Sequence, residues 1–255
     1  MAIEELTDKM SFFSHLEELR KRILWSVVAI GIGFIITFRF ADRIIKFVSR
    51  PLSGLKTELV FLAPTEAFWV NMKVAMIAGL GLALPVVLYQ VWAFVSPGLL
   101  RQERRYALPF VFIGTLFFAI GVTFALLVII PFAITFLVSF GENQGIKAMI
   151  SVSSYVDFVL KFVLAFGLVF ELPLIITVGS RMGIVTPQFL SRNRKYAILI
   201  NFVIAAILTP TPDIFNQSLM AGPLIVLYEV GIISARIFGR RPAKAGATDG
   251  AATDG

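Results

Sequence analysis

Long apolar segments alternate with short charged segments along the whole chain. An apolar helix needs about 20 residues to cross a bilayer, and most of these segments are at least that long. The fifth segment is shorter and reaches only about 20 Å at 1.5 Å per residue. The pattern predicts an all-α membrane protein with six transmembrane helices, the last two of them short. The predicted spans cover about 23–41, 67–95, 107–140, 154–178, 196–208 and 214–235.

Prolines and small residues refine this division. Pro85 predicts a kink in the second span. The third apolar run is about 50 Å long if fully helical, so we expect Pro131 to bend it and its end to lie along the outer surface. Pro51 falls in a segment that we interpret as an outer loop. Residues 1–240 are expected to form one integral membrane domain, and the small, polar residues 241–255 a disordered tail.

The positive charges are distributed unevenly between the two sides of the predicted membrane. Of the 23 lysines and arginines, 15 fall in the N-terminal segment, the two even-numbered loops and the tail. The odd-numbered loops hold five, although the first of these loops is unusually basic. Because short cytoplasmic loops carry the excess of Lys and Arg, both termini are predicted to be cytoplasmic. The net charge of +7 then reflects topology and does not imply nucleic acid.

Composition argues against most enzymatic chemistry. Hydrophobic residues make up 58% of the chain and charged residues 15%, against about 25% charged in soluble domains. There is no cysteine, and the single histidine, His15, precedes the first span, so an intramembrane serine–histidine pair is excluded. No glycine-rich phosphate loop occurs. An acid pair of Glu171 and Glu229 could be proposed, but nothing joins them in sequence. We therefore expect no enzyme, no cofactor and no metal site.

Two glutamates lie among the positive charges of the predicted cytoplasmic side. Glu18 lies in HLEELRKRI and Glu103 in RQERR. Carboxylates at one membrane depth could hold a pair of guanidinium groups, since arginine matches a carboxylate with two parallel hydrogen bonds and lysine cannot. The alternative is local: Glu18 could pair with Arg22 at i,i+4, and Glu103 could be neutralised by its flanking arginines. Ser14 and Glu17 fit a helix-capping box.

Other charged residues lie within the predicted spans. Glu171 has apolar residues on both sides and Pro173 close behind. Intramembrane carboxylates are costly and usually face a partner or a cavity, so Glu171 is an internal hydrogen-bond acceptor, a contact for a partner's helix or a proton-sensitive position. Asp157 and Lys161 are spaced for an internal ion pair. We expect Lys73 to extend toward the membrane surface and Glu229 to be satisfied by its neighbours.

The chain resembles TatC, the large subunit of the twin-arginine protein translocase, over about residues 12–240. The resemblance rests on motifs that occur in the family's order. One departure is TPTPD, where many relatives read TPPD. The matching motifs are HLEELRKRI, Pro51–Leu52, PVVLYQVWAFVSPGLLRQERR at 85–105, AFGLVFELP at 165–173 and LTPTPDIFNQ at 208–217.

The resemblance implies a receptor that binds twin-arginine signal peptides of folded precursors. Such a receptor lies in the cell inner (plasma) membrane and recruits single-span TatA-like and TatB-like partners into a multi-copy complex in membrane lipid, and export is driven by the proton-motive force. Carried over by motif, the expected residues are Glu18, Glu103, Arg20, Phe94 and Leu99 for the signal peptide, Glu171 for the partner helix, and Pro51 and Asp213 in the outer loops.

Two other functions remain open at this stage. In an ion-coupled small-solute transporter or channel, Glu171 and Glu229 would line an ion path through this chain alone. The absence of a visible internal repeat speaks against it. In a passive scaffold, the acids of the basic side would only balance local charge.

Overall fold

The structure, a computed structural model, describes residues 2–54, 59–98, 104–145, 149–209 and 214–239. Most of these residues are helical, and two short strands, β1 (Leu59–Val60) and β2 (Ile150–Ser151), occur among the connecting turns. A π-helical turn, η4 (Ala125–Ile129), joins α4 to α5. The α-helices are α1 (Ala2–Phe38), α2 (Ala41–Val48), α3 (Glu66–Val95), α4 (Ala107–Phe124), α5 (Ile130–Glu142), α6 (Val152–Phe170), α7 (Leu172–Arg181), α8 (Pro187–Arg192), α9 (Arg194–Leu208) and α10 (Ile214–Phe238), and 3-10 turns form η1 (Arg50–Gly54), η2 (Ser96–Gly98) and η3 (Arg104–Tyr106).

Within the described residues, five helical segments are long and apolar enough to cross a membrane: Ser14–Phe38, Glu66–Val95, Ala107–Glu142, Val152–Arg181 and Gln217–Phe238. They match five of the six predicted spans. α9 has 15 residues and is only about 22 Å long, so its predicted shortness is confirmed and the count of six remains a prediction. α10 was also expected to be short, which was wrong, because it has 25 residues.

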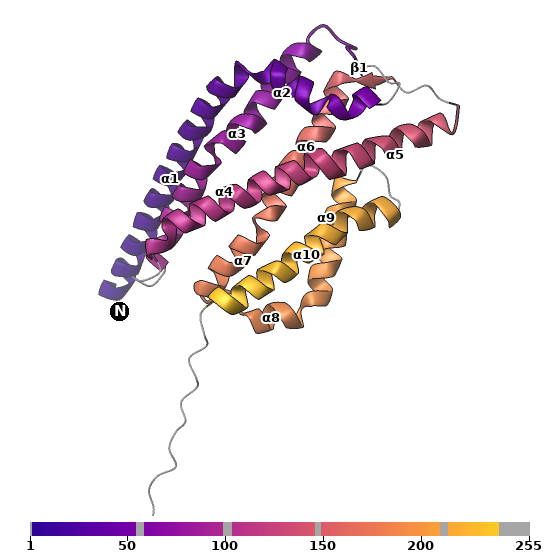
Figure 1. Ribbon diagram of the computed structural model, residues 1–255. Helices are drawn as coiled ribbons and strands as arrows, with labels where there is room; N and C mark the ends of the chain where they lie inside the picture. The colour runs from indigo at the N-terminus through magenta and orange to yellow at the C-terminus, as the bar shows by residue number, and fades with distance from the viewer. Residues whose placement is uncertain (1, 55–58, 99–103, 146–148, 210–213, 240–255) are drawn as a thin grey trace, which may run out of the picture.

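α1 lies lengthwise against α3 (Figure 1). The two helices meet at glycines: a Cβ on Gly33 would lie 2.4 Å from the carbonyl oxygen of Gly79. Small residues let the backbones of membrane helices approach this closely. Nearby, the hydroxyl of Thr37 donates to the carbonyl of Ala75 at 2.7 Å. The glycine contact therefore fixes the position of α1, which carries Glu18.

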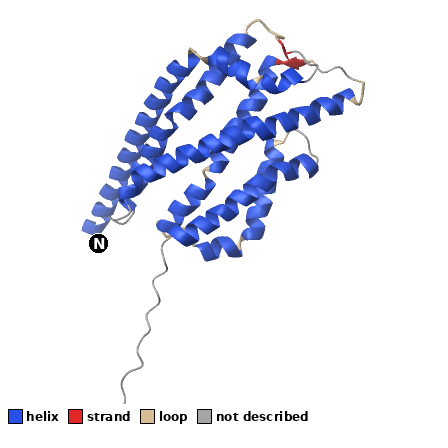
Figure 2. Cartoon of the chain, viewed as in Figure 1, coloured by secondary structure: helices blue, strands red, loops and turns tan. Residues whose placement is uncertain are grey.

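The hydrophobic core is centred on α6, which runs between α3 and α4 on one side and α9 and α10 on the other (Figures 1 and 2). Phe162 and Phe166 of α6 are fully buried. α4 crosses α6 at glycine: a Cβ on Gly121 would lie 2.5 Å from the carbonyl oxygen of Phe166. Aromatic side chains bury more surface than most other residues and dominate the energetics of a core. The two buried rings therefore make α6 the centre of the packing of the bundle.

α4, η4 and α5 continue as one long rod (Figure 1). Pro131 is the second residue of α5, and only Ile130 separates it from the π turn. Proline has no N–H and its ring collides with the carbonyl four residues earlier, and a π turn is one way to relieve that collision. The bend expected at Pro131 was therefore wrong, because the chain forms a π turn there inside one continuous helix (Figure 1). Likewise, α3 continues through Pro85.

The bundle has two distinct ends, which we call the basic end and the strand end. The basic end contains the first turns of α4 and α9, the last turns of α3, α7 and α10, and α8 (Figure 1). Glu18 of α1 belongs to this end, because its partner Arg22 donates to Gln90 near the end of α3. At the strand end, β1 pairs in parallel with β2, Leu59 opposite Ile150.

The strand end also contains α2, in the segment that the sequence analysis interpreted as a loop. Ala41 of α2 is buried, Ile44 and Ile45 pack against the core, and Arg43 and Lys46 are exposed. Two of the four basic residues that make this segment unusually positive thus lie on the exposed face of an amphipathic helix.

Candidate functional sites

Glu18 lies on α1 at the basic end, one turn before Arg22. Its Oε1 accepts a hydrogen bond from Nη2 of Arg22 at 3.2 Å, and the Glu18 side chain remains 33% exposed. Nη1 of Arg22 in turn donates to Gln90 of α3 at 3.1 Å. The local i,i+4 pair therefore forms, and it leaves Oε2 of Glu18 without a hydrogen bond to any other described residue.

The surface around Glu18 is hollowed. An open depression of about 810 Å³ runs along α1 and is lined by Glu18, Arg20, Arg22 and Trp25, among others. One turn before Glu18, His15 stacks on Phe94 of α3 with ring centroids 4.5 Å apart. The structure thus brings together three of the predicted signal-peptide residues, Glu18, Arg20 and Phe94, at one end of two packed helices. Glu103 and Leu99 lie outside the described residues.

Ser14 lies inside α1, which begins at Ala2. The capping box predicted for Ser14 and Glu17 was therefore wrong, because the helix of the first span extends through the whole preceding segment. Glu18 accordingly projects from the interior of a long helix, and its backbone position is fixed by the packing of α1 on α3.

Glu171 lies at the junction of α6 and α7. It is 6% exposed, and Oε1 has no hydrogen-bond partner among the described residues. The facing residue on α4 is Gly114, where a Cβ would lie 3.2 Å from Oε2. A buried polar atom without a partner costs about 1–3 kcal/mol. The predicted internal hydrogen bond is thus missing among these residues, and the carboxylate keeps a vacant acceptor next to a glycine.

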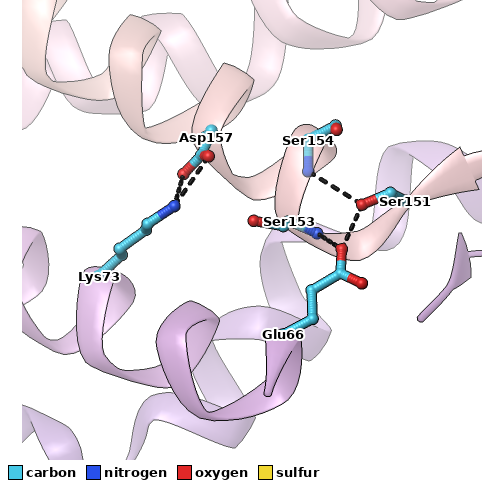
Figure 3. Close-up of polar contacts among 6 residues, drawn as sticks. All are labelled: Glu66, Lys73, Ser151, Ser153, Ser154 and Asp157. Carbon is cyan, nitrogen blue, oxygen red and sulfur yellow. Dashed lines mark hydrogen bonds and ion pairs between the residues drawn. The ribbon is translucent and has the colours of Figure 1, made fainter. Parts of the chain in front are cut away.

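The strand end contains a polar cluster that the sequence analysis missed. Glu66, the first residue of α3, is buried and its Oε2 accepts a hydrogen bond from the backbone N–H of Leu62 at 2.7 Å. Its Oε1 accepts from the hydroxyl of Ser151 and from the backbone N–H of Ser153 at 2.8 Å (Figure 3). One carboxylate therefore joins the first turn of α3 to the first turn of α6. The sequence shows a glutamate at the start of a helix, but it does not show that its partner is a serine 85 residues away.

The neighbouring charges differ from their predicted roles. Asp157 of α6 pairs with Lys73 of α3, with Nζ–oxygen distances of 2.7 and 2.8 Å (Figure 3). The predicted Asp157–Lys161 pair was therefore wrong, whereas the extension of Lys73 toward the membrane surface stays a prediction. Lys161 instead donates to the carbonyl of Ile207 at 2.8 Å. The packing of α3 on α6 brings a more favourable partner to Asp157 than its own helix does.

Of the two residues expected to function in the outer loops, the structure describes one. Pro51 lies in η1 beside the buried Leu52, at the strand end. Asp213 lies outside the described residues.

Glu229 of α10 is paired, as expected, with Nη2 of Arg194 of α9 at 2.8 Å. Among the described residues, no hydrogen bond joins it to Glu171. With Lys73, Asp157 and Glu229 all in ion pairs, few ionisable groups are left for an ion path, so the structure gives the transporter alternative no support.

Comparisons with known proteins identify relatives of the whole bundle. The family model for the Sec-independent protein translocase protein (TatC) matches residues 14–223. A TatC of Desulforapulum autotrophicum is 44% identical, covering 92% of this chain and 87% of its own length. A TatC of Carboxydothermus hydrogenoformans is 43% identical, covering 89% of this chain and 93% of its own.

Solved structures also identify TatC proteins as relatives of this chain. A crystal structure of the twin-arginine translocase receptor TatC superposes with a TM-score of 0.77 at 39% identity, covering 88% of this chain and 98% of that one. A second, of TatC in DDM, gives 0.78 at 40% identity. These likenesses make the chain a membrane component of a protein translocase and not an enzyme. The chain belongs to the TatC family of Sec-independent protein translocase proteins.

Proposed function

We propose that this chain is the receptor of the translocase and binds twin-arginine signal peptides at its basic end. The observation that carries the proposal is Glu18, partly exposed beside an open depression and with an oxygen free of described partners. An ionised carboxylate has about four acceptor positions, so it can hold an arriving guanidinium without releasing Arg22. By the positive-inside rule, the basic end faces the cytoplasm, where precursors are made.

The apolar part of the depression is suited to the hydrophobic stretch that follows the paired arginines. Leu24, Trp25 and Val28 continue along α1 from Glu18, and Trp25 is exposed. Glu103, two residues before Arg105 in the sequence, is proposed as the second carboxylate.

Photo-crosslinking tests this function. A twin-arginine peptide with a photoreactive residue in its hydrophobic stretch should form adducts with residues 14–28 of α1 and with α3 near Phe94. The Glu18→Lys/Glu103→Lys variant should lose these adducts, whereas Glu142→Lys, at the exposed end of α5, should keep them. Undiminished crosslinking to the double lysine variant refutes the proposal.

We propose further that Glu171 contacts a polar side chain of a single-span partner helix. The support is the Oε1 atom without a described partner, because a donor on a second helix could form a hydrogen bond with it. Such interhelical bonds stabilise the association of membrane helices by about 0.6 kcal/mol on average. Glu171→Ala should reduce co-purification of the partner, and Glu171→Gln, which keeps an acceptor oxygen, should reduce it less. Equal recovery with all three proteins would place the contact elsewhere.

A further inference from the structure

A groove separate from the Glu18 depression opens at the basic end, between α4 and the packed pair α7 and α10. Its volume is about 400 Å³. The walls are apolar: Ile113 and Phe117 of α4, Leu174 and Val178 of α7, and Val230 of α10. Because α4, α7 and α10 all belong to candidate membrane spans, the groove lies beside lipid chains.

Two guanidinium groups converge on one ring at the mouth of this groove. Tyr106 lines the groove, and the Cζ atoms of Arg105 and Arg181 lie 5.4 and 5.0 Å from its ring centroid. Nε of Arg181 donates to the carbonyl of Phe238 at 2.9 Å, which fixes the guanidinium. In the described part of the chain, no carboxylate forms an ion pair with either arginine. Two guanidinium groups on one ring, with no ion-pair partner among the described carboxylates, make this mouth attractive to an anion.

The inner part of the groove also carries polar groups. Trp92, 4% exposed, lines it with its ring tilted against Phe110 at a centroid distance of 4.7 Å, and its indole N–H has no partner among the described residues. A buried tryptophan N–H usually has an acceptor. The hydroxyls of Thr177 and Ser234 lie 2.7 Å apart in the same lining. The groove thus combines apolar walls with a cationic mouth and a few polar groups.

The size of the groove decides between a lipid and a helix. An α-helix with its side chains is about 10–12 Å across, so a volume of 400 Å³ would hold only about one turn of it. A single acyl chain is much thinner and can run the length of the walls. Guanidinium groups bind phosphate through two parallel hydrogen bonds, and basic pockets between membrane helices bind anionic lipid headgroups.

We propose that this groove binds one anionic phospholipid, its phosphate on Arg105 and Arg181 and an acyl chain between α4 and the α7–α10 pair. The lipid belongs to the leaflet at the basic end. It fills the groove between α4 and the α7–α10 pair, and it balances the two charges. The proposal does not depend on signal-peptide binding.

The three tryptophans of the chain provide the test. Trp25 and Trp69 are more than half exposed, whereas Trp92 is buried at the groove. A Trp25→Phe/Trp69→Phe protein reconstituted in phosphatidylcholine reports on Trp92 alone. Brominated phosphatidylglycerol should quench its fluorescence at a lower mole fraction than brominated phosphatidylcholine. From the attraction of one surface arginine for anionic lipid, we expect each arginine to favour phosphatidylglycerol over phosphatidylcholine by roughly fivefold in binding.

Variants in the same background separate the site from general surface charge. Arg105→Gln/Arg181→Gln should abolish the selectivity, whereas Arg192→Gln/Lys195→Gln, which removes two exposed charges elsewhere at the basic end, should keep it. Val178→Phe, which fills the groove and keeps both arginines, should weaken quenching by both lipids. Equal quenching of the parent protein by the two lipids overturns the proposal. Selectivity that survives in the Arg105/Arg181 variant overturns it too, and because quenching reports the acyl chain, binding of free phosphate cannot produce a positive result.

Discussion

Replacing Gly79 by alanine tests the contact that positions α1. A Cβ at Gly79 would lie 2.5 Å from the backbone nitrogen of Phe34 and 2.8 Å from the carbonyl carbon of Gly33. Real Cβ atoms do not approach backbone this closely, so α1 must move away from α3. Overpacking of this kind costs roughly 1–3 kcal/mol. At about 2–4 °C per kcal/mol for a chain of this size, a cost of about 2 kcal/mol lowers the unfolding midpoint by roughly 4–8 °C.

A matched control lies two residues from the contact on α1. A Cβ on Gly31 would meet nothing within 4 Å, and alanine is favoured over glycine in a helix by up to about 1 kcal/mol. Gly31→Ala should therefore leave the midpoint unchanged or raise it, measured by thermal unfolding of the purified protein in one detergent at one scan rate. Gly79→Ala should also weaken signal-peptide binding, because Glu18 moves relative to Phe94. A Gly79→Ala midpoint equal to wild type would contradict the close approach of α1 and α3.

Three further changes probe the packing around α6. Glu66→Ala should lower the unfolding midpoint, because two backbone N–H groups and a hydroxyl lose their acceptor, while Glu142→Ala, at an exposed position, should not; equal midpoints would contradict the link between α3 and α6. A double-mutant cycle on Lys73 and Asp157 should give a coupling of about 0.2–1 kcal/mol, since their side chains are 41% and 51% exposed; zero coupling would exclude the pair. Phe166→Ala should cost about 3–5 kcal/mol in denaturant unfolding, because the ring is fully buried, and a loss below 1 kcal/mol would contradict its place in the core.

Hydropathy alone located most of the fold, because the length of an apolar run is set by the membrane. It failed where the chain lies at the strand end. Ala41, Ile44, Ile45 and Val48 follow helical spacing, the signal that identifies α2, but the basic residues between them suggested a loop. Short amphipathic helices are hard to see when only long apolar runs are sought.

The sequence analysis also failed to predict ion pairs between residues on different helices. Sequence spacing favoured Lys161 for Asp157, whereas the fold supplies Lys73 from α3. The Glu18–Arg22 pair was foreseen because both residues lie on one helix. Local pairs are encoded in spacing, but pairs between helices depend on how those helices pack, which here is fixed by close contacts at Gly33 and Gly121.

The account depends most on carboxylates at the basic end selecting arginine over lysine. The direct measurement is the dissociation constant of the purified protein for two signal peptides that differ only in an Arg-Arg or Lys-Lys pair. We expect the wild type to prefer the Arg-Arg peptide by roughly tenfold, which is about 1.4 kcal/mol. The Glu18→Gln/Glu103→Gln variant should bind both peptides equally weakly. A wild type without preference, or a variant that keeps it, would show that these carboxylates do not receive the paired arginines.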